Sequence, residues 1–197
     1  MTFYTVIMNK KINENIFKKF PKLESNRLVY RKFEEKDKHD LFSLRSDDRV
    51  MNFMDSTKHV SLQDSINMID EIHISFKEKT GINWAIIKKS SNEFIGYFGF
   101  WRLIKQHCRA EIGYALKPEF SGKGFMKEAF DKLIDFGFNN LQVHSIEANV
   151  NPKNTKSIRL LEKKGFRKEA HFRENYLFEG NFFDSFIYCL IETGTNQ

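Results

Sequence analysis

The sequence predicts an α+β fold in one domain, with a mixed, mainly antiparallel sheet of about seven strands flanked by helices. Hydrophobic residues make up 41% of the 197 residues, so the chain can bury a substantial core. Several segments alternate in the manner of strands, and others have the three- and four-residue spacing of helices. Only three prolines and ten glycines are present, which argues against low-complexity linkers.

The chain begins with an expected N-terminal extension over residues 1–22, which includes a short amphipathic helix near 13–20. The segment RLVYRKF (27–33) alternates apolar and polar residues and predicts a strand. The segment that follows, residues 34–47, predicts a helix whose apolar contacts come from two leucines and a phenylalanine.

A clearer helix is expected over residues 61–81. Ser61 can cap its start, and Gly81 can follow its end. Helical spacing places the apolar residues on one broad face, with a histidine expected at the edge of that face rather than as a ligand. The residues of this face are Leu62, Ile66, Ile69, His73 and Phe76.

Three strands are expected in the middle of the chain. The two segments between them are short enough to be hairpin turns, so the strands should be adjacent and antiparallel. The strands are expected over residues 82–89, 93–105 and 108–116, with the turns at 90–92 and 105–107.

The second half of the chain continues with a helix that begins around residues 122–125. A strand over 145–150 and a short helix over 155–166 come next, and strands over 167–180 and 181–192 complete the sheet. The buried face of the first of these helices follows from helical spacing. It consists of Met126, Ala129, Phe130, Leu133, Ile134 and Phe138.

Charge and cysteine content narrow the function classes. The net charge of +6 comes from 32 basic and 26 acidic residues without a basic block, so direct binding of nucleic acid is not expected. Cys108 and Cys189 lack CxxC spacing, so no structural zinc or other metal is expected, and the thiols are expected to stay reduced in the cytoplasm. No apolar run approaches the ~20 residues of a membrane span, and no signal peptide is evident.

Two glycines separated by one residue, Gly122 and Gly124, lie at the N-terminus of the predicted helix. A helix start has unpaired N–H groups and the positive end of the dipole, and glycines remove side chains that would block a phosphate. Lys123 and Lys127 add positive charge nearby, which suits a pyrophosphate. The pattern is neither a P-loop nor a Rossmann fingerprint, and by itself it is also compatible with a tight turn carrying a solvent-facing lysine.

The surrounding motifs resemble the GNAT N-acetyltransferase superfamily, and most closely the RimJ/RimL-type ribosomal-protein N-acetyltransferases. The similarity implies a GNAT domain over residues 23–192, with 1–22 as an extension and 193–197 as a tail. The motifs that carry it are LESNRLVYRKFEEKD (23–37), NEFIGYFGF (92–100), AEIGYALKPEFSGKGFMKEA (110–129), NPKNTKSIRLLEKKGF (151–166) and EGNFFDSFIY (179–188).

The resemblance implies that acetyl-CoA binds where two parallel strands splay apart. Backbone groups of Tyr114, Ala115 and Leu116 would pair with the pantetheine amides. Asn154 would touch the pantetheine arm, and Ser157 would lie close to the thioester sulfur. The residues implied to wrap the pyrophosphate are Ser121, Gly122, Lys123, Gly124 and Phe125, with Lys127 nearby; the superfamily often has Gln or Arg at the position of Glu119.

The implied chemistry is direct attack of a primary amine on the thioester, which needs a base for the amine and a proton donor for the thiolate. Glu111 is the candidate base, although it could instead position the substrate or pair with a cation. Many GNAT enzymes have a tyrosine seven residues after the asparagine; Leu161 stands there in this chain. Ser157 is therefore the candidate proton donor, with Tyr114 as a second candidate; a serine bonded to its own backbone and a merely buried tyrosine are the alternatives.

The acceptor is not identified by the sequence. A protein N-terminus, such as that of a ribosomal protein, and a small amine such as an antibiotic, polyamine or amino acid both fit. A sensor that only binds acetyl-CoA and a basic protein that binds RNA or the ribosome are further alternatives, the latter disfavoured by the glycine loop and Asn154. Residues 51–60 and 174–182 are expected to shape the acceptor pocket. A monomer or homodimer without membrane attachment is expected.

Overall fold

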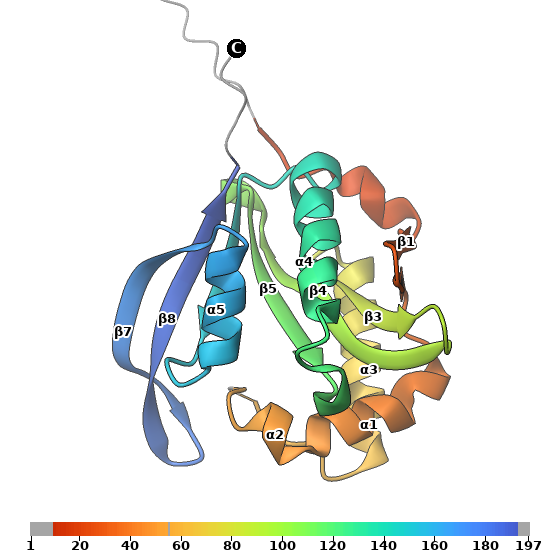
Figure 1. The fold of residues 1–197 in the computed structure, drawn as a ribbon. Coiled ribbons are helices and arrows are strands. Elements are labelled where there is room, and N and C mark those ends of the chain that lie inside the picture. Colours follow the sequence, from red (N-terminus) through yellow and green to blue (C-terminus); the bar gives the residue numbers. More distant parts are fainter. Residues whose placement is uncertain (1–9, 55, 193–197) are drawn as a thin grey trace, which may run out of the picture.

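The computed structural model describes residues 10–54 and 56–192 (Figure 1). Residues 1–9 of the expected extension and the whole expected tail, 193–197, lie outside the described residues. Within the extension, Glu14–Lys18 forms a 3₁₀ turn near the expected short helix, and its Phe17 is buried in the main core.

The described residues form one eight-stranded sheet in the order β1-β2-β3-β4-β5-β6-β8-β7. All neighbouring strands pair antiparallel except β5 and β6, which are parallel. The predicted α+β class is confirmed, and a two-residue edge strand, β1, adds to the expected strands. The bounds are β1 Leu23–Glu24, β2 Leu28–Arg31, β3 Ile82–Lys88, β4 Glu93–Ile104, β5 Arg109–Leu116, β6 Ser145–Val150, β7 Arg167–Phe178 and β8 Asn181–Ile191.

Five α-helices accompany the sheet in the described part of the chain. The helix predicted over 34–47 is divided into a 3₁₀ turn at Glu35–Asp37 and α1, and α2 follows it without having been predicted. Asp47 starts α2 by accepting a hydrogen bond from the backbone of Arg49. The bounds are α1 Lys38–Ser46, α2 Asp48–Met51, α3 Leu62–Lys77, α4 Phe125–Asp135 and α5 Thr155–Lys163.

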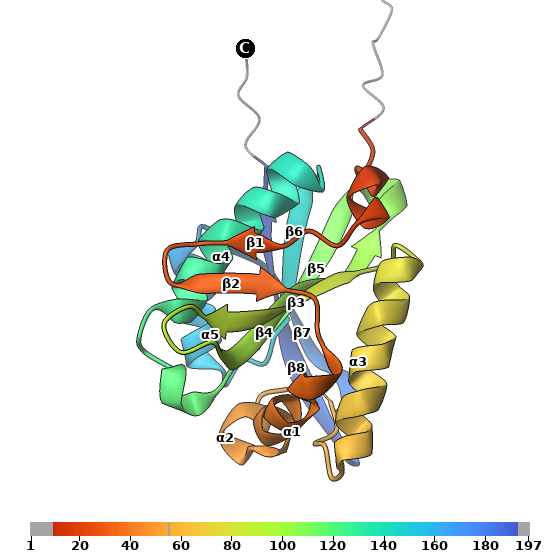
Figure 2. The same cartoon turned by 90° about the vertical axis from the view of Figure 1, so that its right-hand side faces the viewer.

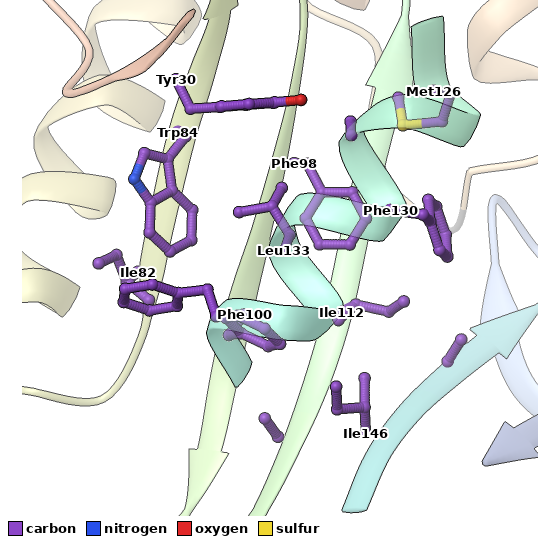
Figure 3. Packing of buried hydrophobic residues seen from close by; sticks show 14 of the residues in the cluster. Tyr30, Ile82, Trp84, Phe98, Phe100, Ile112, Met126, Phe130, Leu133 and Ile146 are labelled. Carbon is purple, nitrogen blue, oxygen red and sulfur yellow. The ribbon is translucent and has the colours of Figure 1, made fainter. Parts of the chain in front are cut away.

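The helices cover both faces of the sheet (Figure 2). Helix α3 lies on one face and α4 on the other. The larger core lies between the sheet and α4, where aromatic rings from β2, β3 and β4 lie near Phe130 and Leu133 of the helix (Figure 3). Trp84 and Phe100 contact each other edge to face there, with ring centroids 6.3 Å apart. This packing holds α4 against the sheet.

Helix α3 begins as predicted but ends differently. Ser61 and Asp64 form a capping box at its start. The expectation that Gly81 closes the helix is wrong, because the left-handed residue after the helix is Lys79, with φ 59°. Gly81 instead allows close approach to β4, since a Cβ there would lie 2.8 Å from the carbonyl oxygen of Trp101.

The buried face of α3 is also rotated from the predicted one. Leu62, expected on this face, is exposed, while the residues that the helix buries are Ser65, Ile69 and Ile72. The helix packs against the sheet with only part of its apolar surface. Helical periodicity therefore predicted the helix correctly but not which residues lie at the centre of its contact with the sheet.

The two parallel strands separate after a short paired segment, as expected. They pair only from Arg109 to Glu111 on β5, opposite Ser145 to Glu147 on β6. Beyond this point β5 continues to Leu116 beside β4, while β6 continues to Val150 beside β8. The opening between β5 and β6 therefore leaves one edge of each strand without a strand partner.

Candidate functional site

The glycine loop connects the end of β5 to the start of α4. Gly122 and Gly124 both have left-handed backbone, with φ 76° and 78°, which other residues adopt at a cost. Among the described residues, nothing accepts a hydrogen bond from the backbone N–H of Gly122, Lys123 or Gly124. These donors stand at the N-terminus of an 11-residue helix, so the loop has the geometry of an anion site.

Aromatic rings fix both sides of this loop. Phe120 and Phe125 are buried and meet edge to face, with centroids 5.9 Å apart. Between them, Ser121 to Gly124 are exposed. Lys123 and Lys127 are also exposed, so the positive charge predicted at the helix start faces solvent.

An ion pair that the sequence did not suggest supports the glycine loop. The Nε of Arg27 donates to Glu128 of α4 at 2.7 Å, and a terminal nitrogen of the same guanidinium donates to the carbonyl of Lys123 at 3.1 Å. The guanidinium also lies 4.3 Å from the centre of the Phe125 ring. The spacing of Glu128 from Gly124 places it in the first helical turn, but no local pattern connects either residue with Arg27.

The last three residues of β5 lie along the opening. Tyr114, Ala115 and Leu116 pair with β4 on one side and have no strand partner on the side of β6. A Cβ at Gly96 would lie 2.2 Å from the carbonyl of Ala115, so glycine is needed where β4 approaches this end of β5. The free edge therefore has a fixed position, as a site for an extended amide-bearing ligand requires.

Two of the candidate catalytic side chains meet across the opening. The hydroxyl groups of Tyr114 on β5 and Ser157 on α5 form a hydrogen bond. The ring of Tyr114 is stacked on Phe98, with centroids 5.7 Å apart, and meets Phe130 edge to face. Burial raises the pKa of Tyr114 to about 12, partly offset by the hydrogen bond with Ser157. The phenol is therefore protonated at neutral pH.

Asn154 caps helix α5. Its side-chain oxygen accepts a hydrogen bond from the backbone N–H of Ser157 at 3.1 Å. The cap orients the first turn of α5 and so directs Ser157 toward Tyr114. Leu161 is fully buried in the core.

Glu111 is the last residue of β5 that pairs with β6, and its side chain is only 12% exposed. Burial raises the pKa of Glu111, the neighbouring Glu147 raises it further, and Arg102 at 3.8 Å lowers it. Glu147 is held in turn by an ion pair with Arg109. Side chains three positions apart on a strand point to opposite faces, so the structure does not bring Glu111 to the Tyr114–Ser157 pair.

A cavity of about 280 Å³ lies between the loop after α2 and the β7–β8 hairpin. The end of α2 contributes Met51, and the loop contributes Asn52, Phe53, Met54, Ser56 and Lys58. The hairpin contributes Tyr176, Phe178, Glu179, Asn181 and Phe183. Asn151, just after β6, also lines it. The two segments expected to shape an acceptor pocket thus lie on opposite walls of one cavity, at the same end of the molecule (Figure 1).

In the described part of the chain, no group of three or more His, Cys, Asp or Glu side chains is arranged to hold a metal ion. Within the same residues, no helix is both long and apolar enough to cross a membrane.

Comparison with known proteins connects this geometry with a family. Residues 27–167 match the model of the acetyltransferase (GNAT) domain. The chain is 35% identical to an uncharacterized N-acetyltransferase, YoaA, of Bacillus subtilis, over 88% of this chain and 98% of that protein. The chain belongs to the GNAT acetyltransferase family.

Other comparisons agree with this assignment. The chain is 37% identical to the uncharacterized N-acetyltransferase p20 of Bacillus licheniformis, over 86% of this chain and 96% of that protein. A GNAT-family acetyltransferase from Bacillus anthracis has the same fold, with a TM-score of 0.77 and 27% identity over 87% of this chain and 98% of that one. The chain is thus an acetyltransferase of the GNAT family, whose acetyl donor is acetyl-CoA.

Proposed function

We propose that this GNAT protein transfers the acetyl group of acetyl-CoA to a primary amine by direct attack within a ternary complex. The observation that carries the proposal is the set of unpaired N–H groups at Gly122, Lys123 and Gly124, beside the free edge of β5. In this assignment the loop from Ser121 to Phe125 holds the pyrophosphate and Lys127 adds charge. Tyr114, Ala115 and Leu116 offer backbone groups to the pantetheine amides, which Asn154 contacts from the other side.

The amine nitrogen forms a bond to the thioester carbonyl carbon, and the C–S bond breaks to release the thiolate of CoA. Before attack, the ammonium must lose a proton. Glu111 is assigned as the base that takes it through water, because its side chain lies on the other face of β5 from the Tyr114–Ser157 pair. Its raised pKa makes its carboxylate a better proton acceptor than an ordinary glutamate.

Ser157 is assigned to the departing sulfur. A phenol with a pKa of about 12 is a much weaker acid than a thiol of pKa about 8.5, so Tyr114 is a poor final source of the proton. The pair is better suited to donating hydrogen bonds, Tyr114 to Ser157 and Ser157 to the developing thiolate. The proton taken by Glu111 before attack passes to solvent. After attack the nitrogen carries one further proton, and its loss through solvent leaves the neutral amide and neutralises the thiolate.

The acceptor is assigned as a protein N-terminus, as for a RimJ/RimL-type enzyme. The protein is assigned to the cytoplasm, and its catalytic domain to residues 23–192. A supporting relative is the [ribosomal protein uS5]-alanine N-acetyltransferase of Escherichia coli, 29% identical over 65% of both chains. A small amine is the second candidate, since the spermidine N(1)-acetyltransferase of Vibrio cholerae is 22% identical over 81% of this chain.

The test is release of free CoA thiol when the pure protein is incubated with acetyl-CoA and a cell extract, with acetylated species found by mass spectrometry. Transfer predicts thiol release that depends on both the protein and the extract, together with a product heavier by one acetyl group. Stabilisation by acetyl-CoA without thiol release would instead identify a sensor. The absence of both stabilisation and thiol release would reject the assignment.

A further inference from the structure

The cavity between the α2 loop and the β7–β8 hairpin has a distinctive lining. Half of its lining side chains are aromatic or thioether groups, and they include Phe53, Phe178 and Phe183. Tyr176 and Phe183 are stacked, with ring centroids 5.5 Å apart and an interplanar angle of 19°. Phe53 is 39% exposed. Flat apolar surfaces of this kind favour a ligand with an apolar or aromatic body.

The charges around the cavity do not favour a polycation. Among its described lining residues, Glu179 is the single carboxylate. Lys58 is the single cation in the same set, and it forms an ion pair with Asp48. A ligand with several ammonium groups would need several carboxylates to replace its water, and the described lining does not provide them.

A buried arginine adds positive charge behind the loop. Arg45 on α1 is only 7% exposed. Its guanidinium donates to Ser56 at 2.8 Å and to the sulfur of Met54 at 3.0 Å, and both of these residues line the cavity. These hydrogen bonds hold the described part of the loop in place beside the cavity.

The cavity is also connected with the proposed transfer site. Asn151 lines the cavity immediately after β6, and its amide contacts the hydroxyl of Tyr176 at 3.5 Å. Three residues further on, Asn154 caps α5 beside Ser157. The segment 151–154 thus joins the cavity wall to the opening between β5 and β6.

We propose that the acceptor is a primary amine carried on an apolar or aromatic body, with no further positive charge. This inference rests on the proposed acetyl transfer and narrows its acceptor. The same chemistry is present in a peptide that begins with phenylalanine and in a free arylalkylamine. The proposal excludes polyamines as the preferred acceptors.

The experiment compares initial rates of CoA release at saturating acetyl-CoA with four acceptors: 2-phenylethylamine, ethylamine, a neutral-bodied peptide with N-terminal phenylalanine, and spermidine. We expect kcat/KM for at least one aromatic acceptor to exceed that for ethylamine and spermidine by about tenfold or more. A higher value for the peptide would assign the natural source as a polypeptide, and a higher value for 2-phenylethylamine would assign a small molecule. Preference for spermidine or ethylamine would overturn the proposal.

A matched pair of variants tests the location. Phe183 lines the cavity, whereas the adjacent Phe182 is 63% exposed and does not line it. Phe183→Ala is expected to raise KM for the aromatic acceptor about tenfold without changing acetyl-CoA affinity, and Phe182→Ala should leave both unchanged. Equal effects of the two variants would remove the cavity as the acceptor site. Absence of CoA release with every acceptor, in the wild-type protein, would instead reject the underlying transfer.

Discussion

Arg27 and Glu128 form a two-point contact between the β1–β2 turn and the first turn of α4. The Nε of Arg27 donates to one carboxylate oxygen of Glu128, and the backbone N–H of Arg27 donates to the other, both at 2.7 Å. Ser25 donates to the same carboxylate at 2.7 Å. These residues lie about a hundred positions apart in sequence, and their contact supports the glycine loop from the side opposite the opening.

Removing this contact is predicted to weaken acetyl-CoA binding. Arg27→Ala frees Lys123 and Phe125 from the guanidinium, so we expect the dissociation constant to rise about tenfold, which corresponds to ~1.4 kcal/mol. Calorimetric titration measures it. Lys89→Ala is the control, since Lys89 pairs with Glu24 near the same turn without a contact to the loop. Equal affinity in Arg27→Ala and the wild type would show that the loop needs no such support.

The same contact predicts a pH dependence of stability. Burial disfavours the charged form of Glu128, but hydrogen bonds from Arg27 and Ser25 outweigh this effect and lower the pKa of the carboxyl. A lowered pKa contributes stability above the ordinary value of 4.5 that is lost as pH falls below it. Glu128→Gln should therefore lower the melting temperature at pH 7 and have a smaller effect below about pH 4. A difference that grows on acidification would contradict the assignment.

The two loop glycines are predicted to be essential for the stabilisation that acetyl-CoA provides. A Cβ at Gly122 would meet nothing within 4 Å, and one at Gly124 would lie 3.5 Å from a terminal nitrogen of Arg27. Gly122→Val and Gly124→Val should therefore act mainly through backbone strain and by filling the proposed phosphate space. Both should abolish the rise in melting temperature caused by acetyl-CoA. Gly180→Val is a matched control, because Gly180 has φ 75° and also faces open space. Gly180→Val should lower the stability of the protein but keep the rise in melting temperature caused by acetyl-CoA. A normal rise in the two loop variants would refute the anion site.

Replacement of the proposed base should change both rate and pH profile. Because burial raises the pKa of Glu111, the acidic limb of kcat/KM should lie above the ordinary glutamate value of 4.5. Glu111→Gln should remove this limb and lower turnover ~10²–10⁴-fold with unchanged acetyl-CoA affinity. It should also be at least as stable at pH 7, since a raised pKa means that ionisation above it destabilises the fold. Wild-type turnover in the variant would assign the base elsewhere.

The Tyr114–Ser157 hydrogen bond predicts coupled effects on turnover. Ser157→Ala should lower kcat about 10–100-fold with little change in the acetyl-CoA dissociation constant, because the proposed bond to sulfur strengthens only in the transition state. Tyr114→Phe keeps the ring between Phe98 and Phe130 and should give a smaller loss. If the two act as one unit, the double variant should be no slower than Ser157→Ala. Full kcat in Ser157→Ala would leave the serine as a packing residue.

Much of the local structure could be predicted because it depends on neighbouring residues. The hairpin turn at residues 90–92 and the strand 145–150 follow from nearby turn residues and alternation, and both are present. The end of α3 was predicted wrongly at Gly81, because a distant requirement, close approach to Trp101, explains that glycine. Local patterns do not distinguish a glycine that ends a helix from one that admits a neighbouring strand.

Residue patterns along the chain were enough to predict the α+β class, the glycine loop at the start of α4 and, through several motifs in order, the family. The point at which β5 and β6 stop pairing, Glu111, is visible only in the folded protein. The tertiary structure also placed Ser157 against Tyr114, Arg27 against Glu128, and the α2 loop opposite the β7–β8 hairpin. The physical reason is separation along the chain: such contacts follow from the order of strands in the sheet and the packing of helices on it, whereas spacing and propensity describe only residues within a few turns of each other.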